Sequence, residues 1–352
     1  MKLATTTIYL VTLTTAAWSQ SGRVKVVETP SPTPTVVLVP RKDKTKAPTP
    51  TPRPRSIPEV VEEVVKIDSQ LVPIPVSVLD VQGRAVANLK LADFELKIDG
   101  NPAEIGDISR SETPIRLAML FDNSSSVTIA REFEKAAAVR FFRRVLRPEK
   151  DFAALFSVAD YTRLEQPLTR NIDQLTGAIL SFPEPQGATA LLDGIIEVAE
   201  YLKGTDGRRV VVLVTDGEDT ISDIRTTLEK VLKALQTANC QVYVVRTKEF
   251  ENFKRTGKRA GNANIRVLDA ERRMIEITNQ TGGRVYSPID DDELDDAFRH
   301  ITADLSQQYV LSYYPDADEA KAGTFKAISL AVISRPHLDV RSRKGYYLPK
   351  PK

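Results

Sequence analysis

The feature that most constrains the fold is a regular alternation, beyond Arg116, of apolar strand-like segments with helical patterns. Segments such as "VVVLV" are apolar throughout, which is typical of strands whose two sheet faces are both covered by helices. The strand-like segments are 116–121, 152–158, 208–215, 241–246 and 284–286. The helical patterns are 130–146, 171–182, 190–202, 225–238, 269–282 and 291–307. This alternation predicts a doubly wound α/β domain with a mostly parallel sheet, which we place at 115–307.

The segments on either side of this domain show a different, strand-rich pattern. Between 60 and 114, "LVPIPVSVLD" and "DFELKIDGNPAEIGDIS" read as strands joined by tight turns, with Asp99-Gly100 marking a hairpin. Between 308 and 352, "YVLSYY", "TFKAISLAVIS" and "LDVRSRKGYYL" again read as strands, with no helical pattern between them. Because both sets flank the α/β domain, we expect them to complete one small β-rich domain.

The N-terminal region predicts export. Lys2, an apolar threonine-rich stretch and small residues around Ala17 and Ser19 are typical of a cleaved secretory signal peptide at 1–19, although an ordinary strand or an uncleaved anchor stays open. Residues 20–59 include "TPSPTPTVVLVPRKDKTKAPTPTPRPRSIP", and so much proline favours an extended, disordered tether over a packed core. No later segment is apolar for long enough to span a bilayer. We therefore expect a periplasmic, cell-surface or secreted protein without a transmembrane segment in the mature chain.

Charge and cysteine content give weaker information. The formal charge of +2 does not by itself indicate nucleic acid or a membrane as a partner. The single cysteine, Cys240, rules out an intramolecular disulfide. Its apolar surroundings in "NCQVYVV" predict a buried structural thiol rather than a reactive one.

Oxygen-bearing side chains gather where predicted parallel strands end. In open α/β sheets, ligands bind at the carboxyl ends of the strands. The segment "FDNSSSV" follows the first strand, "TDGED" follows a later one, and "PQGATALLDG" precedes a helix. The residues expected at this rim are Asp122, Ser124, Ser126, Thr189 and Asp216. Hard divalent cations prefer oxygen ligands, so the pattern predicts a Mg²⁺ or Mn²⁺ site that can accept one more carboxylate from outside.

The order Asp-x-Ser-x-Ser, Gly-x-Thr-Ala and Asp-Gly resembles the metal-ion-dependent adhesion site of von Willebrand factor type A (VWA) domains, over about residues 115–308. The resemblance implies that Ser124 and Ser126 coordinate the ion directly and Thr189 directly or through water. Asp122 and Asp216 would act mostly through water. Ser125 stands where many relatives carry glycine, which implies a stiffer turn.

The flanks, such as "VLDVQGRAVANLKLADFELKIDGNPAEI" and "VRSRKGYY", are similar to bacterial VWA-related proteins described from acidobacteria, over about 65–347. That resemblance names no partner. It implies a fold and a site. Taken with the predicted export, the chain is expected to be an exported, non-enzymatic binding or adhesion protein whose metal captures an acidic group of a protein or glycan.

Two other functions stay open. One is a structural or assembly module whose metal site is used only structurally or not at all. The other is a metal-dependent phosphatase of the haloacid dehalogenase type. That phosphatase chemistry needs a second carboxylate two residues after the nucleophilic aspartate, where this chain has Ser124.

A basic stretch, "FENFKRTGKRAGNANIRVL", follows the strand that ends near Arg246 and is expected to be a loop on the metal rim. Its cations would form a basic collar that favours an acidic partner, or they are ordinary solvated surface. The collar residues are Lys254, Arg255, Lys258 and Arg259. A single aromatic residue in the basic part, Phe253, provides no stacking platform, which argues against nucleic acid.

Overall fold

The computed structural model describes residues 71–110, 113–258, 264–315 and 323–348, all within one compact unit that spans Val64–Lys352. The predicted signal peptide at 1–19 and tether at 20–59 lie outside the described residues. Across the described part of the chain, no helix combines the length and apolar character needed to cross a membrane.

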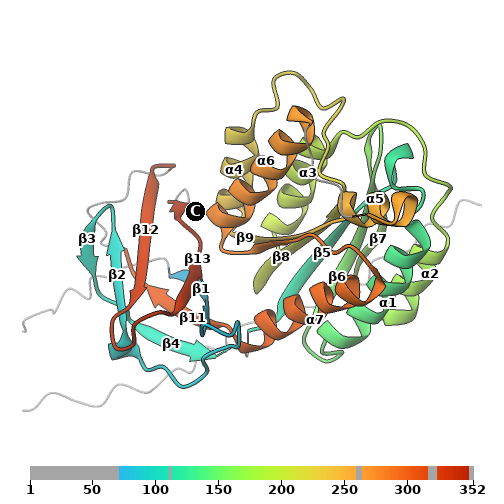
Figure 1. Ribbon diagram of the computed structural model, residues 1–352. Helices are drawn as coiled ribbons and strands as arrows, with labels where there is room; N and C mark the ends of the chain where they lie inside the picture. The colour runs from blue at the N-terminus through green and yellow to red at the C-terminus, as the bar shows by residue number, and fades with distance from the viewer. Residues whose placement is uncertain (1–70, 111–112, 259–263, 316–322, 349–352) are drawn as a thin grey trace, which may run out of the picture. The chain divides into compact units, whose positions relative to one another are not determined.

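A six-stranded sheet in the order β10-β9-β8-β5-β6-β7 forms the centre of the α/β region (Figure 1). Five strands are parallel: β5 (Ile115–Asp122), β6 (Phe152–Val158), β8 (Arg208–Thr215), β9 (Cys240–Arg246) and β10 (Arg284–Tyr286). This arrangement confirms the predicted doubly wound α/β fold. Strand β7 (Thr162–Thr169), which was not predicted, pairs antiparallel with β6 at the sheet edge. Its sequence, "TRLEQPLT", is mostly polar because an edge strand is only partly covered.

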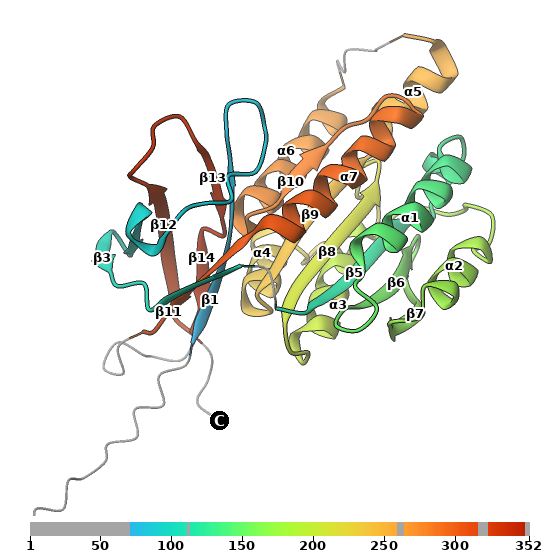
Figure 2. The same cartoon turned by 90° about the horizontal axis from the view of Figure 1, so that it is seen from below.

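Helices cover both faces of this sheet (Figure 2). One layer contains α1 (Arg131–Val145), α2 (Ile172–Leu180) and α7 (Asp291–Gln307), and the other contains α3 (Leu191–Lys203), α4 (Leu228–Thr237) and α6 (Ile265–Thr281). Along β5, Leu117 and Met119 pack into the first layer, whereas Ala118 and Leu120 pack into the second. Covered on both sides, the central strands are apolar through their middle positions, such as Val210–Val214 of β8, and carry polar residues only toward their ends.

The segment expected to be a basic loop is largely helical. Helix α5 (Lys248–Thr256) ends at Gly257, whose φ of +67° is the left-handed conformation that commonly terminates helices. Helix α6 begins at Ile265, four residues earlier than predicted, because the Asn264 side chain caps it by accepting the Arg266 N–H at 2.9 Å. Lys254 and Arg255 therefore lie on a helix rather than in a loop.

The remaining strands form two four-stranded sheets, ordered β13-β1-β11-β4 and β14-β12-β2-β3. Before the α/β region lie β1 (Val72–Leu79), β2 (Phe94–Ile98), β3 (Asn101–Ala103) and β4 (Asp107–Arg110), with the short 3-10 turn η1 (Leu91–Asp93). After it lie β11 (Tyr309–Tyr313), β12 (Phe325–Val332), β13 (Asp339–Ser342) and β14 (Gly345–Tyr347). β11 pairs with β1 and β4, β13 pairs with β1, and β12 pairs with β2. Each of these pairings joins a strand from before the α/β region to a strand from after it. The predicted hairpin at Asp99-Gly100 is present, with both residues at positive φ.

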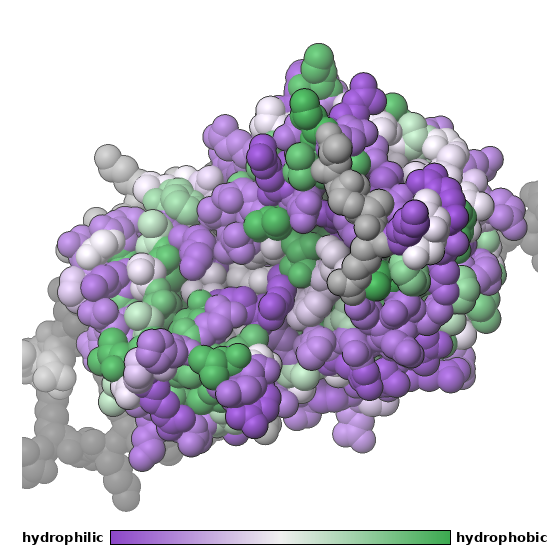
Figure 3. Space-filling model, viewed as in Figure 1, coloured by the Kyte–Doolittle hydropathy of each residue, from purple (hydrophilic) through white to green (hydrophobic). Residues whose placement is uncertain are grey.

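The sheets of the β-rich region share one apolar core that includes Ile74, Leu96, Tyr309 and Leu311. In the segment "YVLSYYP", Tyr309 and Tyr313 are buried in this core, whereas Tyr314 is exposed. On the face shown in Figure 3, the surface is mainly hydrophilic, and apolar residues gather only in small groups.

Candidate metal centre

Three segments at the carboxyl edge of the central sheet bring the five predicted residues together. Asp122 ends β5, Asp216 directly follows β8, and Thr189 lies two residues before α3. The sequence placed these side chains on an open rim, but four of the five are at most 3% exposed, and only Ser126 is exposed. The site therefore opens to solvent on the Ser126 side and is otherwise enclosed by the protein.

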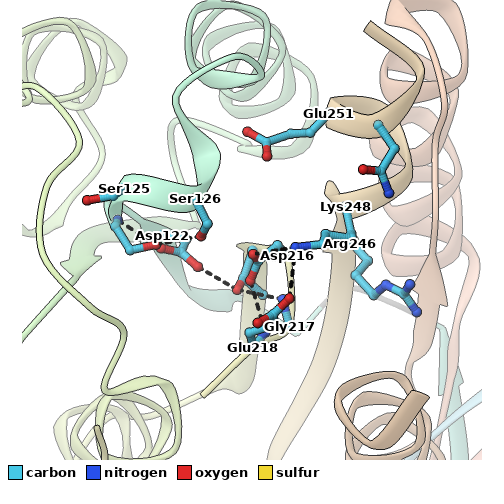
Figure 4. A network of polar contacts seen from close by, with 12 residues as sticks. Asp122, Ser125, Ser126, Asp216, Gly217, Glu218, Arg246, Lys248 and Glu251 are labelled. Carbon is cyan, nitrogen blue, oxygen red and sulfur yellow. Dashed lines mark hydrogen bonds and ion pairs between the residues drawn. The ribbon is translucent and has the colours of Figure 1, made fainter. Parts of the chain in front are cut away.

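Hydrogen bonds fix the two carboxylates in different ways (Figure 4). Asp122 accepts the Ser124 N–H at 3.0 Å on one oxygen and the Thr215 hydroxyl at 2.8 Å on the other. Asp216 accepts the Glu218 N–H at 2.9 Å through Oδ1. Its Oδ2 is buried and has no hydrogen-bond partner among the described residues. One carboxylate oxygen of the site thus lacks a hydrogen bond and has Lys248 Nζ 3.6 Å away.

The serine hydroxyls and the threonine loop are held close to these carboxylates. Ser124 Oγ and Ser126 Oγ are 2.9 Å apart. The Ser125 N–H donates to the Gly187 carbonyl at 3.2 Å, and the Thr189 N–H donates to the Thr220 hydroxyl at 2.8 Å. These bonds tie the serine turn to the threonine loop, and that loop to the segment carrying Asp216.

Two backbone positions in these loops have different requirements. Gly187 has a φ of +80°, and a Cβ there would lie 2.6 Å from Asp160 Oδ1, so the loop requires glycine. Ser125, by contrast, is not among the described residues with positive φ. Serine is therefore compatible with the backbone at the position where the resemblance implied glycine.

Burial and like charge dominate the electrostatics of the site. Burial and the nearby charge of Asp216 together raise the pKa of Asp122 to about 6, despite the lowering effect of hydrogen bonds from Ser124 and Thr215. Behind the site, burial raises the pKa of Glu134 to about 8, and neither of its carboxyl oxygens has a regular hydrogen bond among the described residues. A bound cation would relieve the repulsion between Asp122 and Asp216.

Arg131 supports the serine turn from behind. Its Nη1 donates to the Asp122 backbone carbonyl at 3.1 Å, and its Nη2 bonds the Asn123 side chain. The guanidinium also lies 4.9 Å from the ring centres of Phe121 and Phe182. Arg131 therefore positions the turn through its backbone and a neighbouring amide.

Helix α5 adds two charged residues that the sequence analysis missed. Lys248 Nζ lies 2.8 Å from Glu218 Oε1 and 3.6 Å from Asp216 Oδ2. Glu251 is half-buried, its Oε1 accepts a long hydrogen bond of 3.5 Å from the Ala130 N–H, and burial raises its pKa. Figure 4 shows both side chains at the site. Lys248 directly follows a strand that ends at this rim, which was the available signal, but the basic stretch we considered began at Phe250. Glu251 lies within that stretch but was not assigned to the site.

The four predicted collar residues differ in environment. Lys254 forms an ion pair with Asp291 at 2.7 Å, and its ammonium lies 4.3 Å from the Phe133 ring centre. Arg255 donates to the Asn252 side chain, and Lys258 is exposed. Arg259 lies outside the described residues. The collar is thus partly engaged in contacts within the protein.

The donor set at the rim fits a hard divalent cation. It combines two carboxylates with the hydroxyls of Ser124, Ser126 and Thr189, and this all-oxygen chemistry suits Mg²⁺ or Mn²⁺. Nowhere in the described ranges do three or more His, Cys, Asp or Glu residues gather to hold a metal ion. A cation at this rim would therefore depend on the hydroxyls as well as on Asp122 and Asp216.

A doubly wound sheet with a Ser-x-Ser turn, a threonine loop and a second aspartate at one rim is the arrangement of a VWA domain. Residues 117–218 match the family described as the von Willebrand factor type A domain. This match agrees with the family that the motif in the sequence resembles. No curated protein matches the chain.

Solved structures with similar folds come from several sources. The PilB minor pilin from Streptococcus sanguinis is 13% identical, with a TM-score of 0.42, over 55% of this chain and 62% of the pilin, which is less than two thirds of the pilin's length. BatB from Bacteroides thetaiotaomicron is 14% identical, with a TM-score of 0.39, over 53% of this chain and 97% of that chain. Proximal thread matrix protein 1 from the mussel byssus is 18% identical, with a TM-score of 0.44, over 59% of this chain and 51% of that chain. At these values the likenesses do not indicate what this chain binds.

Proposed function

We propose that this chain is an exported, non-enzymatic binding protein that uses a divalent cation to bind an acidic group of a partner. The observation that carries the proposal is the buried Oδ2 of Asp216, which lacks a hydrogen bond at the same rim as the Ser124–Ser126 hydroxyl pair. A buried carboxylate oxygen without a hydrogen bond is costly unless a cation compensates it, and the Lys248 ammonium, 3.6 Å away, lies beyond hydrogen-bond distance. The match of residues 117–218 to the VWA family supports the same site.

Mg²⁺ or Mn²⁺ would be held by Asp122, Ser124, Ser126, Thr189 and Asp216. When bound, the ion supplies an electrophilic position for a carboxylate oxygen from outside. Ser126 is the exposed member of the set, so an incoming ligand would approach on its side. The hydrogen bonds among the three segments hold these donors in place before the ion arrives, which reduces the ordering cost of binding.

We further propose that the acidic group belongs to a protein rather than a glycan. The segment that follows Asp216 exposes two isoleucines, Ile221 at 46% and Ile224 at 97%. The same segment is fixed to the threonine loop, because the Ile221 N–H donates to the Thr189 carbonyl at 3.2 Å. Ordered apolar side chains beside a polar site are typical of protein interfaces.

The first test measures metal binding by calorimetry in the wild type and in Asp122→Asn. We expect the substitution to weaken Mg²⁺ or Mn²⁺ binding by at least about tenfold, because it removes one of two charges on the site, a loss of at least ~1.4 kcal/mol. Asp206→Asn, at an exposed position before β8, is the matched control and should bind like the wild type. Unchanged metal affinity in Asp122→Asn would contradict the proposed site.

The partner is then sought by capture from an envelope extract with Mg²⁺ and with EDTA. We expect a protein that the wild type retains only with Mg²⁺ and that Asp122→Asn does not retain. Partner binding that EDTA leaves unchanged would favour a structural module with a silent site. Hydrolysis of an aryl phosphate that Asp122→Asn abolishes would favour the phosphatase instead.

A further inference from the structure

Lys248 lies beside Asp216 Oδ2, the buried carboxylate oxygen that has no hydrogen bond among the described residues. It is the first residue of α5, and the preceding residue, Thr247, donates its N–H to the Thr215 carbonyl at 3.0 Å. This bond fixes the start of α5 next to Asp216. The Lys248 side chain is 22% exposed, and its Nζ lies 3.6 Å from Asp216 Oδ2, at ion-pair rather than hydrogen-bond distance.

We propose that Lys248 is a tethered cation that competes with the divalent metal for Asp216 and makes the site selective against monovalent cations. This inference rests on the proposed metal-binding function, which it extends to the selectivity of the same site. The competing contact is the ammonium of Lys248 beside the buried carboxylate oxygen (Figure 4).

The selectivity follows from charge. Na⁺ or K⁺ carries the same charge as the ammonium, and the ammonium is already held at Asp216 without loss of translational freedom. A monovalent ion therefore gains little by replacing it. A divalent ion interacts about twice as strongly with the two carboxylates at equal distance, so it can displace the ammonium.

Glu218 gives the displaced ammonium another partner. Lys248 Nζ already lies 2.8 Å from Glu218 Oε1, so it can leave Asp216 and remain paired. Metal binding then requires a small movement of one side chain rather than exposure of a buried charge. The residual repulsion between the nearby ammonium and the metal should still weaken metal binding.

The test compares Lys248→Met with Lys254→Met by calorimetric titration of Mg²⁺. Both substitutions remove one positive charge from α5, but Lys254 pairs with Asp291 rather than with the site. We expect Lys248→Met to bind Mg²⁺ roughly tenfold more tightly than the wild type, and Lys254→Met to differ by less than about twofold. Lys248→Arg, which keeps the charge, should bind like the wild type.

A second readout addresses selectivity directly. Mg²⁺ titrations are repeated in NaCl and in tetramethylammonium chloride at the same ionic strength, because the bulky organic cation does not fit a small oxygen site. We expect Na⁺ to weaken Mg²⁺ binding to Lys248→Met and to have little effect on the wild type. Thermal unfolding of each variant verifies that it is folded.

The outcomes separate this inference from the proposed function. Equal Mg²⁺ affinity in Lys248→Met and the wild type would overturn the inference and leave the proposed function standing. Mg²⁺ binding by Lys248→Met but not by the wild type would support the inference and contradict the proposed function. In that case Lys248 would occupy the place of the metal in the wild type, and the site would not bind a cation. Binding by neither protein would overturn both.

Discussion

Buried aspartates at opposite ends of the central sheet have different surroundings. Asp151, just before β6, accepts the Ile115 N–H at 2.8 Å and the Arg147 N–H at 2.9 Å, and it forms an ion pair with the Arg147 side chain. Asp216, at the other end, keeps one oxygen without a hydrogen bond. The first arrangement stabilises the fold, whereas the second suits a site that must accept a ligand.

Asp151 gives a prediction about stability and pH. Burial alone would raise its pKa, but hydrogen bonds from Arg147 and Ile115 lower it below the ordinary value of 3.8. A lowered pKa means that the carboxylate stabilises the fold above that ordinary value and loses its contribution as the pH falls through the lowered one. We expect Asp151→Asn to cost about 1.5–3 kcal/mol at pH 7.

Urea unfolding of the wild type and Asp151→Asn at pH 7 and pH 3 measures this contribution. The difference between the two proteins should shrink at pH 3, because Asp151 in the unfolded chain, with its ordinary pKa of 3.8, is then mostly protonated and unfolding takes up a proton. Mg²⁺ affinity should not change, since Asp151 lies at the amino end of β6. An equal loss at both pH values would show that the charge of Asp151 is unimportant.

Cys240 illustrates a residue whose role was predictable. It is 4% exposed, and burial raises the pKa of its thiol to about 12. The structural thiol predicted from the apolar sequence around it is therefore confirmed.

At the scale of elements, helix α5 places two charged residues, Lys248 and Glu251, at the site. Its sequence, "KEFENFKRT", has too few apolar residues to mark a helix by periodicity. Phe250 is nevertheless fully buried and lies 5.5 Å from the Phe133 ring on α1. The helix thus depends on a contact with a residue more than a hundred positions earlier.

The basic collar remains a proposal at this scale. Neutralising Lys254, Arg255, Lys258 and Arg259 to glutamine should slow association with an acidic partner and flatten its dependence on salt. Metal affinity should stay within about twofold of wild type, because salt screens the interaction of exposed charges with the site. Lys254 should contribute less than Lys258, since it is already paired with Asp291.

Association rates with the Mg²⁺-dependent partner, measured at low and high ionic strength, test the collar. Lys203→Gln, on α3 and paired with Glu200, serves as the control for removal of a surface charge elsewhere. A wild-type association rate at low ionic strength in the quadruple variant would show that these residues are ordinary surface.

At the scale of the whole molecule, the two flanks are interleaved strand by strand. β11 lies between β1 and β4, and β2 lies between β12 and β3. The flanks also contact the α/β region, because Gln308 Nε2 donates to Ser77 Oγ at 2.8 Å and to Gln241 Oε1 at 3.1 Å. Neither flank has a complete sheet without the other.

This interleaving predicts the behaviour of a truncated chain. A fragment that ends at Gln308 lacks β11 to β14. This loss leaves β1 and β4 without partners and β2 paired only with β3, and it exposes residues such as Ile74 and Leu96. We expect the fragment to aggregate, because unpaired sheet edges join other chains. Light scattering and thermal unfolding against the full chain measure this. A soluble fragment with an unchanged unfolding temperature would show that the flanks are not needed for stability.

Local sequence determined the α/β alternation, the central strands and the three segments that carry Asp122, Thr189 and Asp216. It could do so because apolar periodicity is set by near neighbours and because parallel strands end at one edge of a sheet. Only the tertiary structure decided the burial of Asp122, the edge strand β7, the helix α5 and the approach of Lys248 to Asp216. Each of these depends on which distant segments come into contact, and that information is absent from any short stretch of sequence.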